Sequence, residues 1–148
     1  MSPTAPEGDP SAIGAPRRRL RLDRAACEAA PDGYCLAGVG MDWCGRAFSA
    51  EARALDTQHG RVRASAEAAL AAALAAAGPH VRLELVGVKA FRAFDGWVVV
   101  VRILGSAGQR DFRLLGASSS EDQGGLPRTS AEAVLDATNR VVEGYALP

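Results

Sequence analysis

Aromatic residues are scarce in this sequence, at 5% of its 148 residues, and lysine occurs once, at Lys89. A hydrophobic core must therefore be built mainly from Ala, Val and Leu. The sequence also lacks a surplus of charge, because 17 basic side chains balance 17 acidic ones. Proteins that bind nucleic acids or anionic membranes through charge carry a basic surplus. We therefore expect neither nucleic acid nor a membrane as a partner.

Long apolar runs are absent as well. The opening residues contain no apolar stretch of about seven, as a signal peptide requires, and no run reaches the length of about 18 that marks a membrane helix. The sequence contains three cysteines, Cys27, Cys35 and Cys44. No two of them are separated by the two to four residues that are typical of a zinc site. These absences predict a cytoplasmic protein with free thiols and with no metal or cofactor.

An internal repeat is the most informative feature that is present. RASAEAALAAA at residues 63–73 returns as RTSAEAVLDAT at residues 128–138. Leu20 and Leu22 match Leu83 and Leu85 at a spacing of 63 residues, and the sequence DGY at residues 32–34 matches DGW at residues 95–97 at the same spacing. The spacing grows to 65 at the RASAEA repeat, and the added residues fall in expected turns. This pattern indicates a duplication.

Each half of the sequence predicts three strands followed by one helix. Strands are indicated by alternating or continuous apolar residues and turns by Pro, Gly and Asp. The first expected strand begins at Arg19, and the other five cover residues 34–41, 46–55, 81–88, 97–104 and 110–117. The expected helices cover residues 65–77 and 130–144. We therefore predict an α+β fold of two duplicated β-β-β-α units, in which one helix covers each antiparallel sheet. Residues 1–17 are expected to form a disordered Pro-rich tail, residues 18–78 the first unit and residues 79–148 the second.

Two segments suggest how the units are packed. WVVVVRIL at residues 97–104 is apolar at every position except Arg102, and such a run is typical of a strand buried on both faces. The Ala-rich helix expected at 65–77 allows close approach of a neighbouring element, so we expect it at a buried seam between units or between subunits.

The order of elements over residues 19–145 resembles the C-terminal regulatory domain of 2-isopropylmalate synthase. GRVR at residues 60–63 and GGLPR at residues 124–128 stand where that family has a glycine-x-glycine-proline lead into the helix. The resemblance implies two units about a pseudo-twofold axis, a dimer, and an amino acid bound between the units. The family's ligand-binding residues have no counterparts that can be placed on this chain.

Read from the first helix, the α-β-β-β-α order also resembles a double-stranded-RNA-binding domain. That family has a lysine-rich start to its last helix, which contacts phosphates. Here the corresponding segment has Arg128 as its only nearby cation and carries Glu132 and Asp136, so RNA binding is not expected.

The repeated helix starts are candidates for anion binding, because a helix N-terminus and an arginine both favour negative charge. The candidate residues are Arg63, Ser65, Arg128, Thr129 and Ser130. In the alternative interpretation the hydroxyls only cap the helices, with Thr129 and Glu132 forming a capping box, and the arginines pair with nearby glutamates.

Tyr34, Trp43 and Trp97 are candidate interface residues, since aromatic side chains are common anchors of protein contacts. Trp43 in particular is expected to be exposed if it lies in the turn after the second strand. A basic cluster spans residues 17–24, where it either contacts an acidic partner or nucleic acid, or keeps the first strand from pairing with other chains.

Sequence motifs for catalysis are missing, including those of phosphate-binding loops and serine hydrolases. We therefore expect a non-catalytic binding, regulatory or assembly module that acts through protein–protein contacts, as a homodimer or on a larger protein. Three alternatives stay open. The chain could sense a small anionic metabolite at the helix starts, be a small enzyme with a site between the units, or bind nucleic acid.

Overall fold

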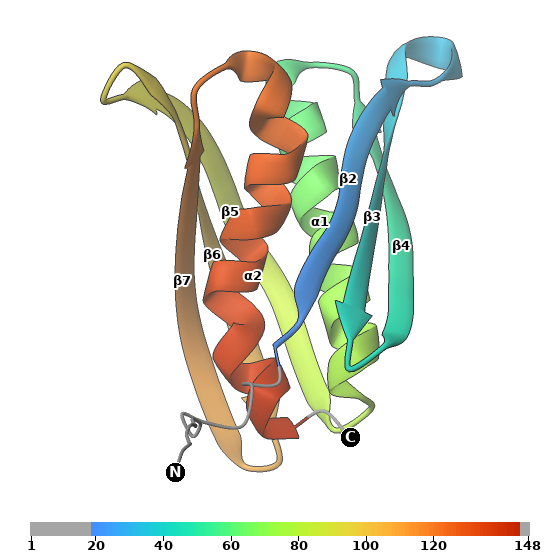
Figure 1. The fold of residues 1–148 in the computed structure, drawn as a ribbon, viewed down its shortest axis with the longest axis vertical. Coiled ribbons are helices and arrows are strands. Elements are labelled where there is room, and N and C mark those ends of the chain that lie inside the picture. The colour runs from blue at the N-terminus through green and yellow to red at the C-terminus, as the bar shows by residue number, and fades with distance from the viewer. Residues whose placement is uncertain (1–18, 146–148) are drawn as a thin grey trace, which may run out of the picture.

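The computed structural model describes residues 19–145, and they form two β-β-β-α units (Figure 1). The first unit contains β2 (Arg21–Ala29), η1 (Pro31–Gly33), β3 (Tyr34–Trp43), β4 (Arg46–Leu55) and α1 (Gln58–Ala77). The second contains β5 (Val81–Ala93), β6 (Gly96–Ala107), β7 (Arg110–Ser120), η2 (Gln123–Gly125) and α2 (Leu126–Tyr145). Each sheet is antiparallel, in the orders β2-β3-β4 and β5-β6-β7. The predicted fold class is confirmed, while the expected tail and the first residues of the basic cluster lie outside the described residues.

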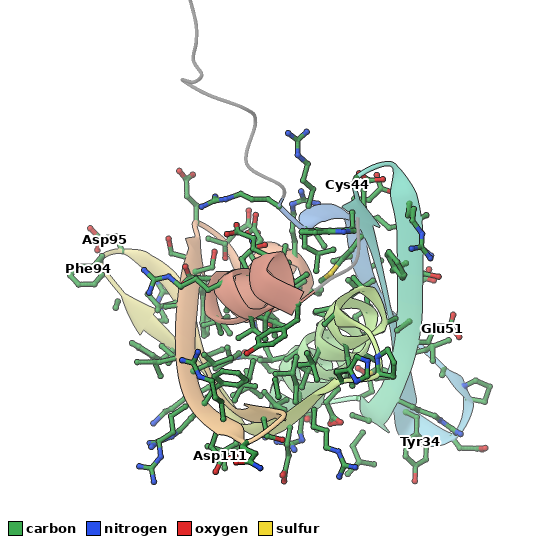
Figure 2. All side chains as sticks on the ribbon, turned by 90° about the horizontal axis from the view of Figure 1, so that it is seen from below. Tyr34, Cys44, Glu51, Phe94, Asp95 and Asp111 are labelled. Carbon is green, nitrogen blue, oxygen red and sulfur yellow. The ribbon has the colours of Figure 1, made fainter. Side chains whose placement is uncertain are left out.

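The two helices lie side by side in a middle layer between the two sheets (Figures 1 and 2). Helix α1 packs against β3 and β4 of its own unit and against β5 of the other. Helix α2 packs in the equivalent way against β6, β7 and the other unit's β2. One core therefore joins both units, and each sheet turns its second face outward.

Helix α1 is buried on most of its circumference because it lies between two sheets and beside α2. Its buried alanines are Ala64, Ala66, Ala68, Ala69, Ala72, Ala73, Ala76 and Ala77. A methyl side chain lets backbones approach closely, which explains why this helix contains so few large residues. The expectation that the Ala-rich helix lies at a buried seam between units is confirmed.

Both helices begin earlier than the sequence pattern predicts. Thr57 caps α1 by accepting a hydrogen bond from the Gly60 N–H at 2.9 Å, and Asp122 accepts from the Gly125 N–H at 3.0 Å. The predicted capping box is wrong, because Thr129 lies inside α2 and donates its hydroxyl to the Gly125 carbonyl. The strands of the second unit are also longer than expected, since Ser106 and residues 118–120 pair in the sheet instead of forming turns.

Several local features recur at equivalent positions of the two units. A β-bulge interrupts the pairing between Leu22 and Arg24, and another interrupts it between Leu85 and Gly87, 63 residues later. The caps at Thr57 and Asp122 are 65 residues apart. The Gln123 side-chain amide donates to that of Gln58, its equivalent in the first unit, so this contact lies on the pseudo-twofold axis.

The predicted equivalence of Tyr34 and Trp97 is wrong in register. The turn before β3 has three residues, Pro31–Gly33, whereas the turn before β6 has two, Phe94 and Asp95. Because the turn before β6 is one residue shorter, each side chain after it faces the opposite side of the sheet from the residue aligned with it in β3. Cys35, which is paired with Ala29, therefore corresponds to Trp97, which is paired with Arg92. Trp97 packs against the core, and Tyr34 points to the outer surface (Figure 2).

Candidate functional site

Within the described residues, the outward-facing side of the second sheet carries several exposed apolar side chains. Side chains alternate along β6, so Val99, Val101 and Ile103 are buried against the helices while their neighbours face outward. We define the outer face of the second sheet by the residues that share this side: Arg82, Glu84, Val86, Lys89 and Phe91 from β5; Val98, Val100, Arg102, Leu104 and Ser106 from β6; Asp111, Arg113, Leu115, Ala117 and Ser119 from β7.

Apolar side chains occupy the middle of this outer face. Val86, Phe91, Leu104 and Leu115 are all exposed, and Val98 and Val100 are partly covered. The sequence predicts a strand buried on both faces over residues 97–104. Within the described residues only the inner half of that strand is buried, so Val98, Val100 and Leu104 of the outer half, together with Arg102, have no covering layer.

The equivalent face of the first sheet has a different composition. The outward positions at the middle of β3 are Gly38 and Gly40, which correspond to Val100 and Arg102 of β6. The Arg24 side chain lies across these glycines, with Nε 3.5 Å from where a Cβ of Gly40 would be. Arg53 lies over the Tyr34 ring at 4.3 Å. The two units thus share an inner face and differ in the outer one.

Charged residues frame one end of the outer face of the second sheet. One row across the strands is Arg82–Ser106–Asp111, and the next is Glu84–Leu104–Arg113. A shallow hollow lies over these rows. Figure 2 shows Asp111 pointing away from the helices on this side of the molecule. Positive and negative charges therefore stand on opposite edge strands, with opposite order in the two rows.

The structure does not gather the predicted anion-binding residues into one site. Arg63 pairs with Glu67 at 3.2 Å and Arg128 with Glu132 at 3.8 Å, each one turn along its own helix. The buried hydroxyls of Ser65 and Ser130 donate to the carbonyls of Arg61 and Leu126. Arg63 and Arg128 lie in separate hollows, and the hydroxyls of Ser65, Thr129 and Ser130 donate to helix carbonyls, so anion binding stays a prediction.

A small pocket does lie where the two helices begin, next to the pseudo-twofold axis. Gln58, Arg61 and Gln123 line it, together with Cys27 and Asp56. The Arg61 guanidinium binds the Asp56 carboxylate through two nitrogens and donates to the Cys27 carbonyl at 3.1 Å. The hydrogen bond from Arg61 holds the pKa of the Asp56 carboxyl below its usual value. Sequence reasoning missed this cluster because Cys27 and Gln123 are far from Asp56, Gln58 and Arg61 in the chain.

The candidate interface aromatics have three different environments. Trp43 is buried at the end of β3, so its predicted exposure in a turn is wrong. Trp97 is half-buried, with Arg92 over its ring, and Tyr34 is exposed beneath Arg53. The turn that follows β3 is formed instead by Cys44 and Gly45, both with positive φ.

The three cysteines are free, and they differ in exposure. Cys44 is exposed, whereas Cys35 is buried and Cys27 lies beside it at the inner side of β2. Burial and a hydrogen bond with Cys35 raise the pKa of the Cys27 thiol to about 11. Among residues 19–145, no three His, Cys, Asp or Glu side chains are grouped as a metal site would require.

This arrangement predicts strongly unequal thiol reactivity. The thiolate is the reactive form, and Cys27 holds very little of it near pH 8. We expect iodoacetamide at pH 8 to alkylate Cys44 at least about tenfold faster than Cys27 or Cys35. Peptide mass spectrometry of a time course measures the three rates. Equal rates in the native protein, with no acceleration in urea, would show that the thiols are not placed as described.

Protein-family models and curated protein sequences gave no match to the chain, so the resemblance to the 2-isopropylmalate synthase regulatory domain stays a prediction. Neither helix in the described part of the chain is long and apolar enough to cross a membrane. The choice of a functional site therefore rests on the geometry, and the outer face of the second sheet is the feature that most needs an explanation.

Proposed function

We propose that the chain is a non-catalytic assembly module that binds protein through the outer face of the second sheet. The supporting observation is that three outward side chains of β6, Val98, Val100 and Leu104, are apolar, while the fold covers only the opposite side of this strand. A central strand with Val98, Val100 and Leu104 on its open side gains free energy when another protein removes those side chains from water.

The difference between the two units strengthens this proposal. The first sheet has glycines and an overlying arginine at the middle of its outer face, which suit contact with water. The second sheet has Val100 at the position of Gly38 and Leu104 at the position of Asp42. Packing of the common core cannot explain the difference, because both sets of positions face away from the helices.

Leu104→Asp tests the proposal against Leu36→Asp as a matched control. The two leucines are exposed to 40% and 41% and lie on the outer faces of the second and first sheets respectively. A charge at Leu104 would have to be buried in the assembly, so we expect only this variant to lose it. Size-exclusion chromatography of the tagged chain from its own cells measures the result.

We expect wild type and Leu36→Asp to elute well above the 15.4 kDa of a single chain, and Leu104→Asp to elute as a single chain. Both variants should keep the wild-type circular-dichroism spectrum, because neither leucine belongs to the core. The proposal fails if wild type elutes as a single chain at every loading concentration, or if the two variants elute alike at the same loading.

A further inference from the structure

We propose that the protein bound at this face is a second copy of the chain, packed face to face about a twofold axis parallel to β6. The inference rests on the proposed function and adds the identity and orientation of the partner. In this arrangement β6 lies over β6 of the second copy, and β5 lies over β7, with the strands of both copies pointing the same way.

This inference rests on the charged residues at one end of the outer face of the second sheet. Residues of one row share a height along the strands, so a twofold axis along β6 places Arg82 opposite Asp111 of the second copy. The next row places Glu84 opposite Arg113 of the second copy. Symmetry makes each contact twice, which gives four pairs of opposite charge. Like charges would meet only if both ends of a row had the same sign, and neither row does, so the face is complementary to itself.

The apolar residues match in the same arrangement. Leu104, Val100 and Val98 lie along the axis and meet their own copies, while Val86 of the bulge faces Leu115 of the second copy. Arg102 also lies on the axis, between Val100 and Leu104, and there it meets its own copy. This is the contact between like charges that the symmetry imposes, and it gives a distinctive test; Lys89, which the same symmetry places opposite Ala117 of the second copy, has no charged partner.

Two other ways of joining two copies fit less well. An axis across the strands through the row of Arg102 would place Glu84 opposite Lys89 but would leave Asp111 and Arg113 facing Ser119 and Ala117. Edge-to-edge pairing through β7 is obstructed, because the Ala117 N–H at that edge already donates to Asp136 of α2 at 3.0 Å.

The size of the face sets the expected strength of the dimer. Strands lie about 4.8 Å apart and rise about 3.4 Å per residue, so three strands of this length cover roughly 500 Å². Two copies would bury about 1,000 Å², near the lower limit for a specific interface. We therefore expect a dimer that dissociates on dilution.

Charge reversal at the Glu84–Arg113 contact tests the arrangement. Glu84→Arg alone places like charges together twice, and so does Arg113→Glu. We expect each variant to dissociate about 10- to 100-fold more readily than wild type. An equal mixture of the two variants restores both contacts, so we expect a heterodimer of near wild-type stability. Sedimentation velocity of the purified full chain measures the association, and native mass spectrometry identifies the heterodimer by its mass.

Two further variants complete the test, one as a control and one with an expected gain in dimer stability. Glu51→Arg reverses a charge on the outer face of the first sheet, where Figure 2 shows Glu51 pointing outward, and should leave the dimer unchanged. Arg102→Gln removes the like charges on the axis and should strengthen the dimer several-fold.

A purified wild-type chain that stays monomeric at every concentration would overturn the inference, as would a dimer that ignores both reversals or a mixture that does not recover. If the purified chain is monomeric while the chain from its own cells elutes as a larger species, the partner is a different protein and only the present inference fails.

Discussion

Replacing Gly116 by Val is expected to lower the free energy of unfolding by more than about 3 kcal/mol, because the new side chain has no room between β7 and α2. A Cβ at Gly116 would lie 2.2 Å from the Ala133 carbonyl oxygen and 2.6 Å from the Ala137 nitrogen. Both are backbone atoms of α2, so no side chain can move aside. Helix α2 would have to leave β7, which would open the core between the second sheet and both helices.

Urea unfolding followed by circular dichroism measures this effect. Gly87→Ala is the matched control, because Gly87 lies in the same sheet and a Cβ there meets nothing within 4 Å. We expect the control to change the free energy of unfolding by less than about 1 kcal/mol. If Gly116→Val yields no folded protein, Gly116→Ala tests the same contact with a smaller group. Equal midpoints for the Gly116 and Gly87 variants would contradict the close packing of α2 on β7.

Trp43→Ala is expected to cost about 3–5 kcal/mol, because this side chain is the largest one that the core buries completely. Trp43 is 1% exposed at the end of β3, where the sequence pattern suggests an exposed turn. Trp97→Ala is the natural comparison, since Trp97 is half-buried and sits at the rim of the core. We expect it to cost about half as much or less. Chemical denaturation of both variants decides the matter, and a smaller loss for Trp43→Ala would contradict its burial.

The duplication and the strand order could be predicted because apolar periodicity records which residues face the core. The helix starts could not. Gly60 reads as a helix breaker, yet a Cβ at this position would lie 1.8 Å from the Leu55 carbonyl oxygen, so only glycine lets α1 begin there. That constraint arises from the packing of α1 against the end of β4, which a pattern of residue types does not show.

The candidate site was only partly accessible from the sequence. The sequence shows the apolar residues at 97–101 and 103–104, but it does not show that the fold covers one side of this strand and leaves the other open. The RASAEA and RTSAEA segments were recognisable as equivalent helices, while their hydroxyls turned out to bond to helix carbonyls. Aligning DGY with DGW predicts that Tyr34 and Trp97 lie on the same side of their sheets. The alignment does not show that the turn before β6 is one residue shorter than the turn before β3.

Hydroxyl-radical footprinting of the wild-type chain in an extract of its own cells tests most directly whether the outer face of the second sheet is a protein contact. Leu115 and Leu55 are exposed to 70% and 60% on the outer faces of the second and first sheets, so an isolated chain would be oxidised at both. The proposed assembly predicts that Leu115 and Leu104 are oxidised several-fold more slowly than Leu55 and Leu36. Equal oxidation of the two pairs would contradict it.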